Sequence, residues 1–142
     1  MFERILYVSC ASTGLIPRDV YDIIRNAHNR NSRFGLTGGL LYLDGQFVQV
    51  LEGEAFRLRE RFAIIAADPR HTDVQVRYSA TESERLFPDD WMALRLQGEI
   101  DPHVLTALGY EAGLPAERFD GSKLIDLVQA CCATARQSTQ NG

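Results

Sequence analysis

The sequence predicts an α+β domain: a ferredoxin-like β-α-β-β-α-β-β sheet with two helices on one face and a C-terminal helical extension on the other. Short β-prone segments alternate with two segments whose apolar residues recur at helical spacing. An Asp-Gly pair joins two β-prone runs in the first half of the chain. The 142 residues suit one such domain, placed at residues 1–97, with an extension at residues 98–142.

The first elements are a strand over residues 4–9 and a helix that begins at Pro17. Proline fits the first turn of a helix, where its missing N–H would have no partner in any case. Val20, Ile23 and Ala27 recur at helical spacing. Residues 28–33 are too polar for a core, so we expect the helix to fray there.

A hairpin is the clearest local signal. The β-prone runs 36–43 and 46–51 flank Asp44-Gly45, a pair that accepts the positive φ values of a type I′ turn. The turn fixes the register, so Leu40 faces Gln49 on one side of the sheet. The opposite side is apolar and must be covered by the C-terminal segment or another subunit. Its residues are Leu41, Leu43, Val48 and Val50.

The remaining elements follow in order. A helix is expected over residues 54–67, stopped by Asp68-Pro69. Alternating residues predict strands at 74–79 and 92–97, separated by a charged loop at 81–90. In the extension, helices are expected near residues 101–109 and 122–136. The second presents a stripe that can cover the open sheet face: Leu124, Leu127, Val128 and Cys131.

Composition excludes several classes of function. The net charge is −4 without a basic block, which argues against nucleic acid and anionic membranes as partners. No apolar run is long enough to span a membrane, and the first residues lack a signal peptide, so we expect a cytoplasmic protein. The three histidines fall in separate elements and the cysteines lack zinc spacing, so no metal is expected.

Tyr7, Asn31 and Gln49 form the unusual polar set. By alternation Tyr7 lies on the strand next to Gln49, and its hydroxyl is a natural partner for the amide. Residue pattern alone leaves two interpretations open, because most buried polar pairs are simply hydrogen-bonded core groups.

The sequence resembles the BLUF family of blue-light sensors over about residues 2–97. The resemblance rests on Leu6-Tyr7-x-Ser9, on Asp68-Pro69-Arg70-His71, on Arg85-x-Phe87-Pro88-Asp89 followed by Met92, and above all on two longer stretches. These read Asn31-Ser32-Arg33-Phe34-Gly35-Leu36-Thr37-Gly38-Gly39-Leu40-Leu41-Tyr42 and Gly45-Gln46-Phe47-Val48-Gln49-Val50-Leu51-Glu52-Gly53.

The resemblance implies a flavin held non-covalently between the two helices. FAD is usual in the family, and FMN or riboflavin can substitute. Asn31 would bind the carbonyl edge of the ring, and Gln49 would bridge Tyr7 and the flavin. Asp68 and Arg70 would lie near the ribityl-phosphate end, or would only end the helix and carry surface charge. The full implied cofactor-binding set is Tyr7, Ile23, Arg30, Asn31, Gln49, Ile65, Asp68, Arg70 and Met92.

The family also implies the photochemistry. Light drives electron and proton transfer from Tyr7 through Gln49 to the flavin, and the rearranged hydrogen bonds shift absorption reversibly to the red. The family often reads Phe-x-x-Trp-Ser-Met where this chain has Phe87-Pro88-Asp89-Asp90-Trp91-Met92. Alignment on Phe87 keeps Met92 in place, so Met92 should face the flavin and Trp91 the opposite side.

The expected function is therefore that of a sensor and not of an enzyme, since no substrate bond is made or broken. A chain of this length leaves no room for an effector domain. Homo-oligomers and a separate downstream signalling protein are the expected partners. Two alternatives stay open: a flavin-free oligomerisation or adaptor module, and a single-stranded RNA-binding domain using Tyr7 and Phe47.

Overall fold

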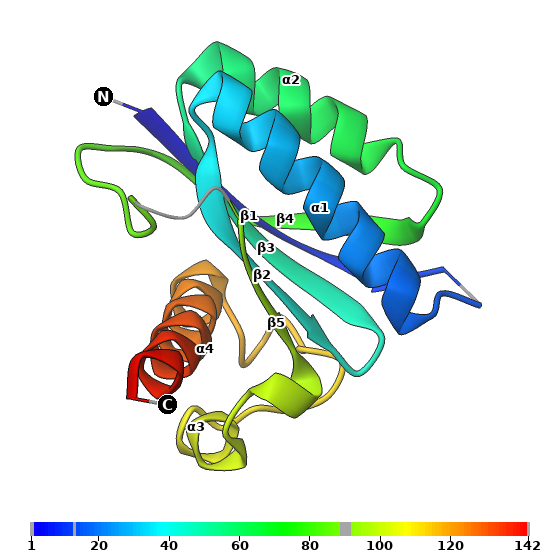
Figure 1. Cartoon of the computed structure of the whole chain (residues 1–142), viewed down its shortest axis with the longest axis vertical. Coiled ribbons are helices and arrows are strands. Elements are labelled where there is room, and N and C mark those ends of the chain that lie inside the picture. Colours follow the sequence, from blue (N-terminus) through cyan, green and yellow to red (C-terminus); the bar gives the residue numbers. More distant parts are fainter. Residues whose placement is uncertain (1, 13, 89–91, 142) are drawn as a thin grey trace.

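The protein is built as a sheet between two helical layers (Figure 1). The computed structural model describes residues 2–12, 14–88 and 92–141. Its strands are β1 (Phe2–Ala11), β2 (Thr37–Leu43), β3 (Gln46–Gly53), β4 (His71–Glu82) and β5 (Ala93–Leu96). Its helices are α1 (Pro17–Phe34), α2 (Ala55–Ala66), α3 (Pro102–Ala107) and α4 (Gly121–Asn141), with a 3-10 turn at Gln97–Glu99.

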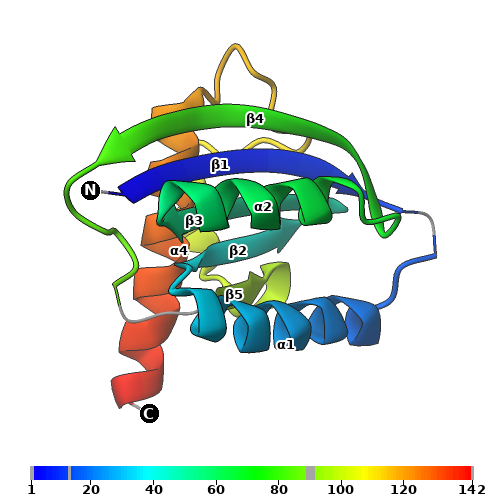
Figure 2. The same ribbon diagram turned by 90° about the horizontal axis from the view of Figure 1, so that it is seen from above.

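The strand order across the described sheet is β4-β1-β3-β2-β5, which confirms the predicted ferredoxin-like topology with one added strand. The first four strands pair antiparallel, and β5 pairs parallel with β2. Helices α1 and α2 cover one face, and α4 covers the other (Figure 1). Figure 2 shows α1 and α2 running in opposite directions beside the sheet. None of the described helices combines the length and apolar character needed to cross a membrane.

The hairpin has the predicted register. Asp44 and Gly45 both adopt positive φ, 48° and 77°, as the type I′ turn requires. Leu40 pairs with Gln49, and Tyr42 pairs with Phe47. Gln49 therefore points to the face that α1 and α2 cover.

The predicted end of the first helix is wrong. Helix α1 continues through residues 28–33 to Phe34 and ends at Gly35, whose φ of 68° is the left-handed conformation that closes many helices. The polar run does not break the helix because the side chains at positions 29, 30, 32 and 33 are exposed to solvent, while Asn31 is buried and 1% exposed. This extra length carries Asn31 to the sheet.

The apolar back of the sheet is covered by the chain's own extension. The stripe predicted on α4 packs there. Its residues Leu124, Leu127, Val128 and Cys131 are buried in one cluster with the sheet residues Leu41, Leu43, Val48 and Val50. Gly39 allows the close approach, because a Cβ atom there would lie 3.0 Å from Phe87 and 3.1 Å from Val128.

The extension also contacts the hairpin tip. The Tyr110 hydroxyl donates a hydrogen bond to the Asp44 carboxylate, and the Asp44 N–H donates to Gln97 Oε1 at 3.0 Å. Burial, together with the Asp44 carboxylate, raises the pKa of Tyr110. Tyr110 thereby stays protonated and able to donate, so the turn that joins β2 to β3 is held from the C-terminal side.

A buried ion pair ties β1 and β3 to the loop before β5. Glu52 is fully buried and accepts a hydrogen bond from Arg4 Nε at 2.8 Å. Its two oxygens also accept the backbone N–H groups of Leu86 and Phe87, both at 2.9 Å. Arg4 forms a second ion pair with Glu82 at 3.1 Å. The Glu52 carboxylate thus accepts three hydrogen bonds, and the charge of Arg4 balances its own.

Replacing Glu52 with Gln should destabilise the fold. The amide NH2 would face N–H donors, and Arg4 would lose its buried counter-charge. We expect the free energy of unfolding in urea to fall by about 3 kcal/mol, typical of a broken buried pair. Glu60→Gln, on the exposed side of α2, serves as the control and should change little. A loss for Glu52→Gln no larger than for the control would contradict the assigned role.

Candidate functional site

A pocket opens between α1, α2 and the sheet. Apolar and polar side chains from both helices and from the strands line it, as in many small-molecule sites. Among the described residues, it brings together eight of the nine positions singled out from the sequence: Tyr7, Ile23, Arg30, Asn31, Gln49, Ile65, Asp68 and Arg70. The ninth, Met92, lies behind Gln49.

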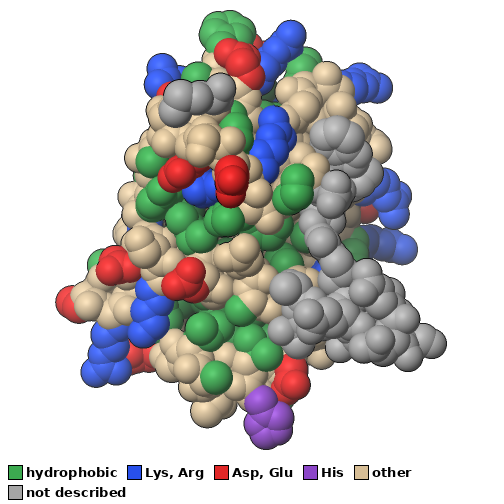
Figure 3. All heavy atoms as spheres, turned by 90° about the vertical axis from the view of Figure 1, so that its left-hand side faces the viewer, with side chains coloured by type: hydrophobic (Ala, Val, Ile, Leu, Met, Phe, Trp, Pro, Cys, Tyr) green, Lys and Arg blue, Asp and Glu red, His purple; other side chains and the backbone are tan. Residues whose placement is uncertain are grey.

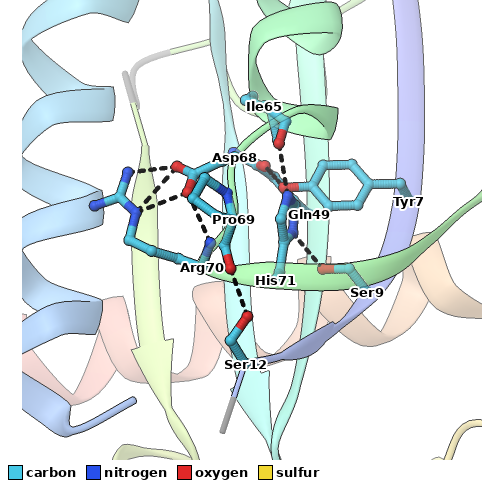
Figure 4. A network of polar contacts seen from close by, with 9 residues as sticks. All are labelled: Tyr7, Ser9, Ser12, Gln49, Ile65, Asp68, Pro69, Arg70 and His71. Atoms are coloured by element: carbon cyan, nitrogen blue, oxygen red, sulfur yellow. Dashed lines mark hydrogen bonds and ion pairs between the residues drawn. The ribbon is translucent and has the colours of Figure 1, made fainter. Parts of the chain in front are cut away.

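Tyr7 and Gln49 form a buried hydrogen bond at the floor of this pocket (Figure 4). Adjacent strands hold them, since Tyr7 on β1 pairs directly with Gln49 on β3. The Tyr7 hydroxyl donates to Gln49 Oε1, and Gln49 Nε2 donates to Met92 Sδ at 3.4 Å. The amide therefore links a phenol on one side to a thioether, a weak acceptor, on the other.

The Tyr7 phenol is kept in its protonated form. The side chain is 3% exposed, and burial, reinforced by the negative charge of Asp68, raises its pKa well above the ordinary value. The Phe62 ring packs edge-on against Tyr7 with centroids 5.6 Å apart. Tyr7 is thus held as a protonated phenol that donates its hydrogen bond to Gln49.

Asp68 and Arg70 form a compact charged turn after α2 (Figure 4). Arg70 Nε lies 3.0 Å from both carboxylate oxygens of Asp68, and the Arg70 N–H donates to Asp68 Oδ1 at 2.9 Å. The hydrogen bond from Arg70 is the main reason that the pKa of Asp68 is lowered. The Pro69 carbonyl accepts from Ser12 Oγ at 2.6 Å, so the turn is fastened to the end of β1.

Met92 faces the pocket side, as the sequence predicts, since it is buried and contacts Gln49. Its expected counterpart Trp91, with Asp89 and Asp90, lies outside the described residues. The aromatic pair on which the RNA-binding alternative depends is covered by the helices: Tyr7 is 3% and Phe47 4% exposed. The two rings therefore do not form the open sheet surface on which such RNA-binding domains stack bases.

His71 is a site residue that sequence reasoning missed. Its Nε2 lies 2.6 Å from the Ile65 carbonyl and its Nδ1 lies 2.7 Å from Ser9 Oγ (Figure 4). A carbonyl can only accept, so Nε2 carries the hydrogen, and Nδ1 of the neutral ring accepts from Ser9. The ring also packs edge-on near Tyr7, with centroids 6.0 Å apart. The available signal was the alternation that puts Ser9 on the same strand face as Tyr7.

Arg61 was missed as well. It lies one helical turn before Ile65 on α2 and also lines the pocket. Burial, followed by the nearby charge of Arg30, lowers its pKa. Its spacing from Ile65 could have indicated this position.

Comparisons with known proteins agree with the geometry. The family model described as sensors of blue-light using FAD, named BLUF, matches residues 2–93. The photoactivated adenylate cyclase subunit beta of Euglena longa is 40% identical over 85 residues. That segment is 60% of this chain but 10% of the relative, so the chain spans only a small part of such proteins.

Two solved structures match along nearly the whole chain. The dark-state structure of BlrB, a BLUF protein, is 29% identical, with a TM-score of 0.76, and covers 94% of this chain and 96% of its own. The photo-activated state of BlsA, at 23% identity and a TM-score of 0.81, covers 93% and 95% and supports the fold alone.

The hydrogen bonds of His71 predict its tautomer. We expect ¹⁵N NMR at pH 8.5 to show a protonated Nε2 and an unprotonated Nδ1, with the signal assigned by its loss in His71→Gln. Ser9→Ala should lower the free energy of unfolding by about 1–3 kcal/mol, because it leaves a buried acceptor without a donor. A hydrogen on Nδ1 in place of Nε2 would refute this arrangement.

Proposed function

The chain belongs to the BLUF family of blue-light sensors that bind flavin, and on that premise we propose that Tyr7 and Gln49 are its photoactive residues. The observation that carries the proposal is the buried hydrogen bond from the Tyr7 hydroxyl to the Gln49 amide at the pocket floor. FAD is the proposed resident flavin, with FMN or riboflavin able to replace it.

The residues around the pocket suit a flavin ring. Ile23 and Ile65 offer apolar contacts to a flat ring from opposite helices. Asn31 and Gln49 present amide groups, which can pair with the carbonyl and N–H groups of the ring's polar edge. These side chains meet the usual pattern of a small-molecule site, which is mostly apolar with a few placed polar groups.

Bound flavin would supply blue-light absorption and a site that accepts an electron. With one electron leaving Tyr7 for that site, Tyr7 would release its phenolic proton toward Gln49 Oε1, the atom that already accepts its hydrogen bond. Gln49 can relay a proton because one amide holds both an acceptor and a donor. Its Nε2 contacts only the weak acceptor Met92 Sδ among the described residues, so little holds the amide against reorienting or changing tautomer.

We propose that the chain is a sensor and not an enzyme, because this chemistry returns every group to its starting state. Residues 1–97 would form the sensor, and residues 98–142 would pass the signal to a separate cytoplasmic protein. Assembly of several copies is part of the proposal. Figure 3 shows hydrophobic side chains gathered in the middle of one face, flanked by charged ones, a surface suited to such contacts.

The signal would leave through the sheet. On β3 the neighbours of Gln49 are Val48 and Val50, which point to the opposite face and pack with Leu124 and Val128 of α4. A changed hydrogen bond at Gln49 can shift the position of α4 only if the sheet contacts α4 differently in the dark and light states.

Removing the relay should abolish the light response while keeping the flavin. Tyr7→Phe removes the transferable proton, and Gln49→Ala removes the amide, so both purified variants should be yellow and show no light-induced red shift. Asn31→Ala should instead weaken flavin binding. Tyr42→Phe, on the same face of the sheet but not among the residues that line the pocket, is the matched control and should respond normally.

Absorption spectra before and after blue light decide this prediction. A normal reversible shift in Tyr7→Phe or Gln49→Ala would refute the assigned roles. A colourless wild-type protein that takes up no added flavin would refute the proposed function as a whole.

Light should also change hydrogen exchange in α4. We compare the full chain in the dark and under continuous light, and expect the amides of residues 121–132 to change protection. Tyr7→Phe should show no such difference, since it binds flavin without the relay. Unchanged exchange across α4 in a protein with a working photocycle would exclude this route.

A further inference from the structure

The charges that line the pocket are unevenly distributed. At one end Arg70 is matched by Asp68, and Asp19 and Asp22 of α1 lie close enough to raise its pKa further. At the other end are Arg30 and Arg61. Asp22 and Arg30 are eight residues apart, about 12 Å along a helix, so the two ends are well separated.

Arg30 and Arg61 face the pocket without counter-charges. Among the described residues neither lies within ion-pair distance of a carboxylate. Arg61 Nε is buried and, within the same part of the chain, has no hydrogen-bond partner. The nearness of Arg30 adds to burial in lowering the pKa of Arg61, so the two cations also repel each other. Two cations from opposite helices, left uncompensated at a pocket, are arranged to receive an anion.

We propose that Arg30 and Arg61 bind the phosphate ester carried on the ribityl chain of FMN and FAD, so that the pocket selects phosphorylated flavins over riboflavin. This inference rests on the proposed function. It moves the phosphate away from Asp68 and Arg70, where the sequence suggested it, because the Asp68 carboxylate already occupies the Arg70 guanidinium and would repel a phosphate.

Guanidinium groups suit this ligand. Arginine presents planar N–H donors that match two phosphate oxygens, and its charge persists at any physiological pH. A phosphate between Arg30 and Arg61 would give the buried Arg61 Nε an acceptor and cancel the repulsion between the helices. Riboflavin ends in a hydroxyl group, which offers no charge and would leave both cations unmatched.

The test compares three flavins on one protein. The full chain is stripped of flavin, and riboflavin, FMN and FAD are titrated while flavin fluorescence is followed. We expect FMN and FAD to bind at least about tenfold more tightly than riboflavin, as expected for one or two charge-assisted hydrogen bonds. Raising the salt concentration should narrow that gap, because it screens charges at an open pocket mouth.

Two variants locate the effect. Arg61→Gln and Arg30→Gln should each remove most of the preference for FMN over riboflavin, because each takes away one of the two charges that would bind the phosphate. Arg61→Lys keeps the charge and should retain part of the preference. The matched controls are Arg59→Gln on α2 and Arg25→Gln on α1, since both arginines are exposed and do not line the pocket.

Each outcome is decisive. Equal, salt-independent affinity of the wild type for riboflavin and FMN would overturn this inference while the proposed function stands. If Arg61→Gln lowers the affinity for all three flavins by the same factor, the inference is also overturned, because Arg61 would then support the structure of the pocket and not bind the phosphate. A wild type that binds none of the three would overturn both. The salt dependence of the wild type needs no variant, so a variant that fails to fold does not block the test.

Discussion

Glu52 carries the constraint on which the site depends. A carboxylate removed from water must be matched on all sides, and here the donors come from Arg4 on β1 and from two backbone N–H groups before β5. One buried charge therefore fixes three segments relative to one another. Two of these segments, β1 and β3, present Tyr7 and Gln49. The hydrogen bond between those two side chains therefore depends on an ion pair that contacts neither of them.

The same sheet performs two tasks because a strand alternates its side chains. The side of β3 that carries Gln49 faces the pocket, and the side that carries Val48 and Val50 faces α4. A displacement of β3 would therefore change contacts both in the pocket and with α4. The fold thereby places the proposed photochemical residue and the surface that packs against α4 one residue apart on the same strand.

Local patterns predicted the sheet and the Tyr7–Gln49 pair well, but they missed the end of one helix and two polar contacts between distant segments. Asp44-Gly45 dictates its own turn, and register then follows for Leu40 and Gln49 without further information. The end of α1 was misjudged, since polar side chains are compatible with a helix whose outer side meets water. His71 and Arg61 were missed because their partners, Ser9 and Arg30, lie on distant segments that only the folded chain brings near.

The described pocket lining and the extension share no residue. Every lining side chain lies between Tyr7 and His71, whereas the back of the sheet meets the C-terminal helix. Any segment with an apolar stripe of the right spacing could therefore replace α4 without altering the chemistry of the pocket. Such interchangeability gives evolution, and protein engineers, a route to couple one light-absorbing module to many outputs.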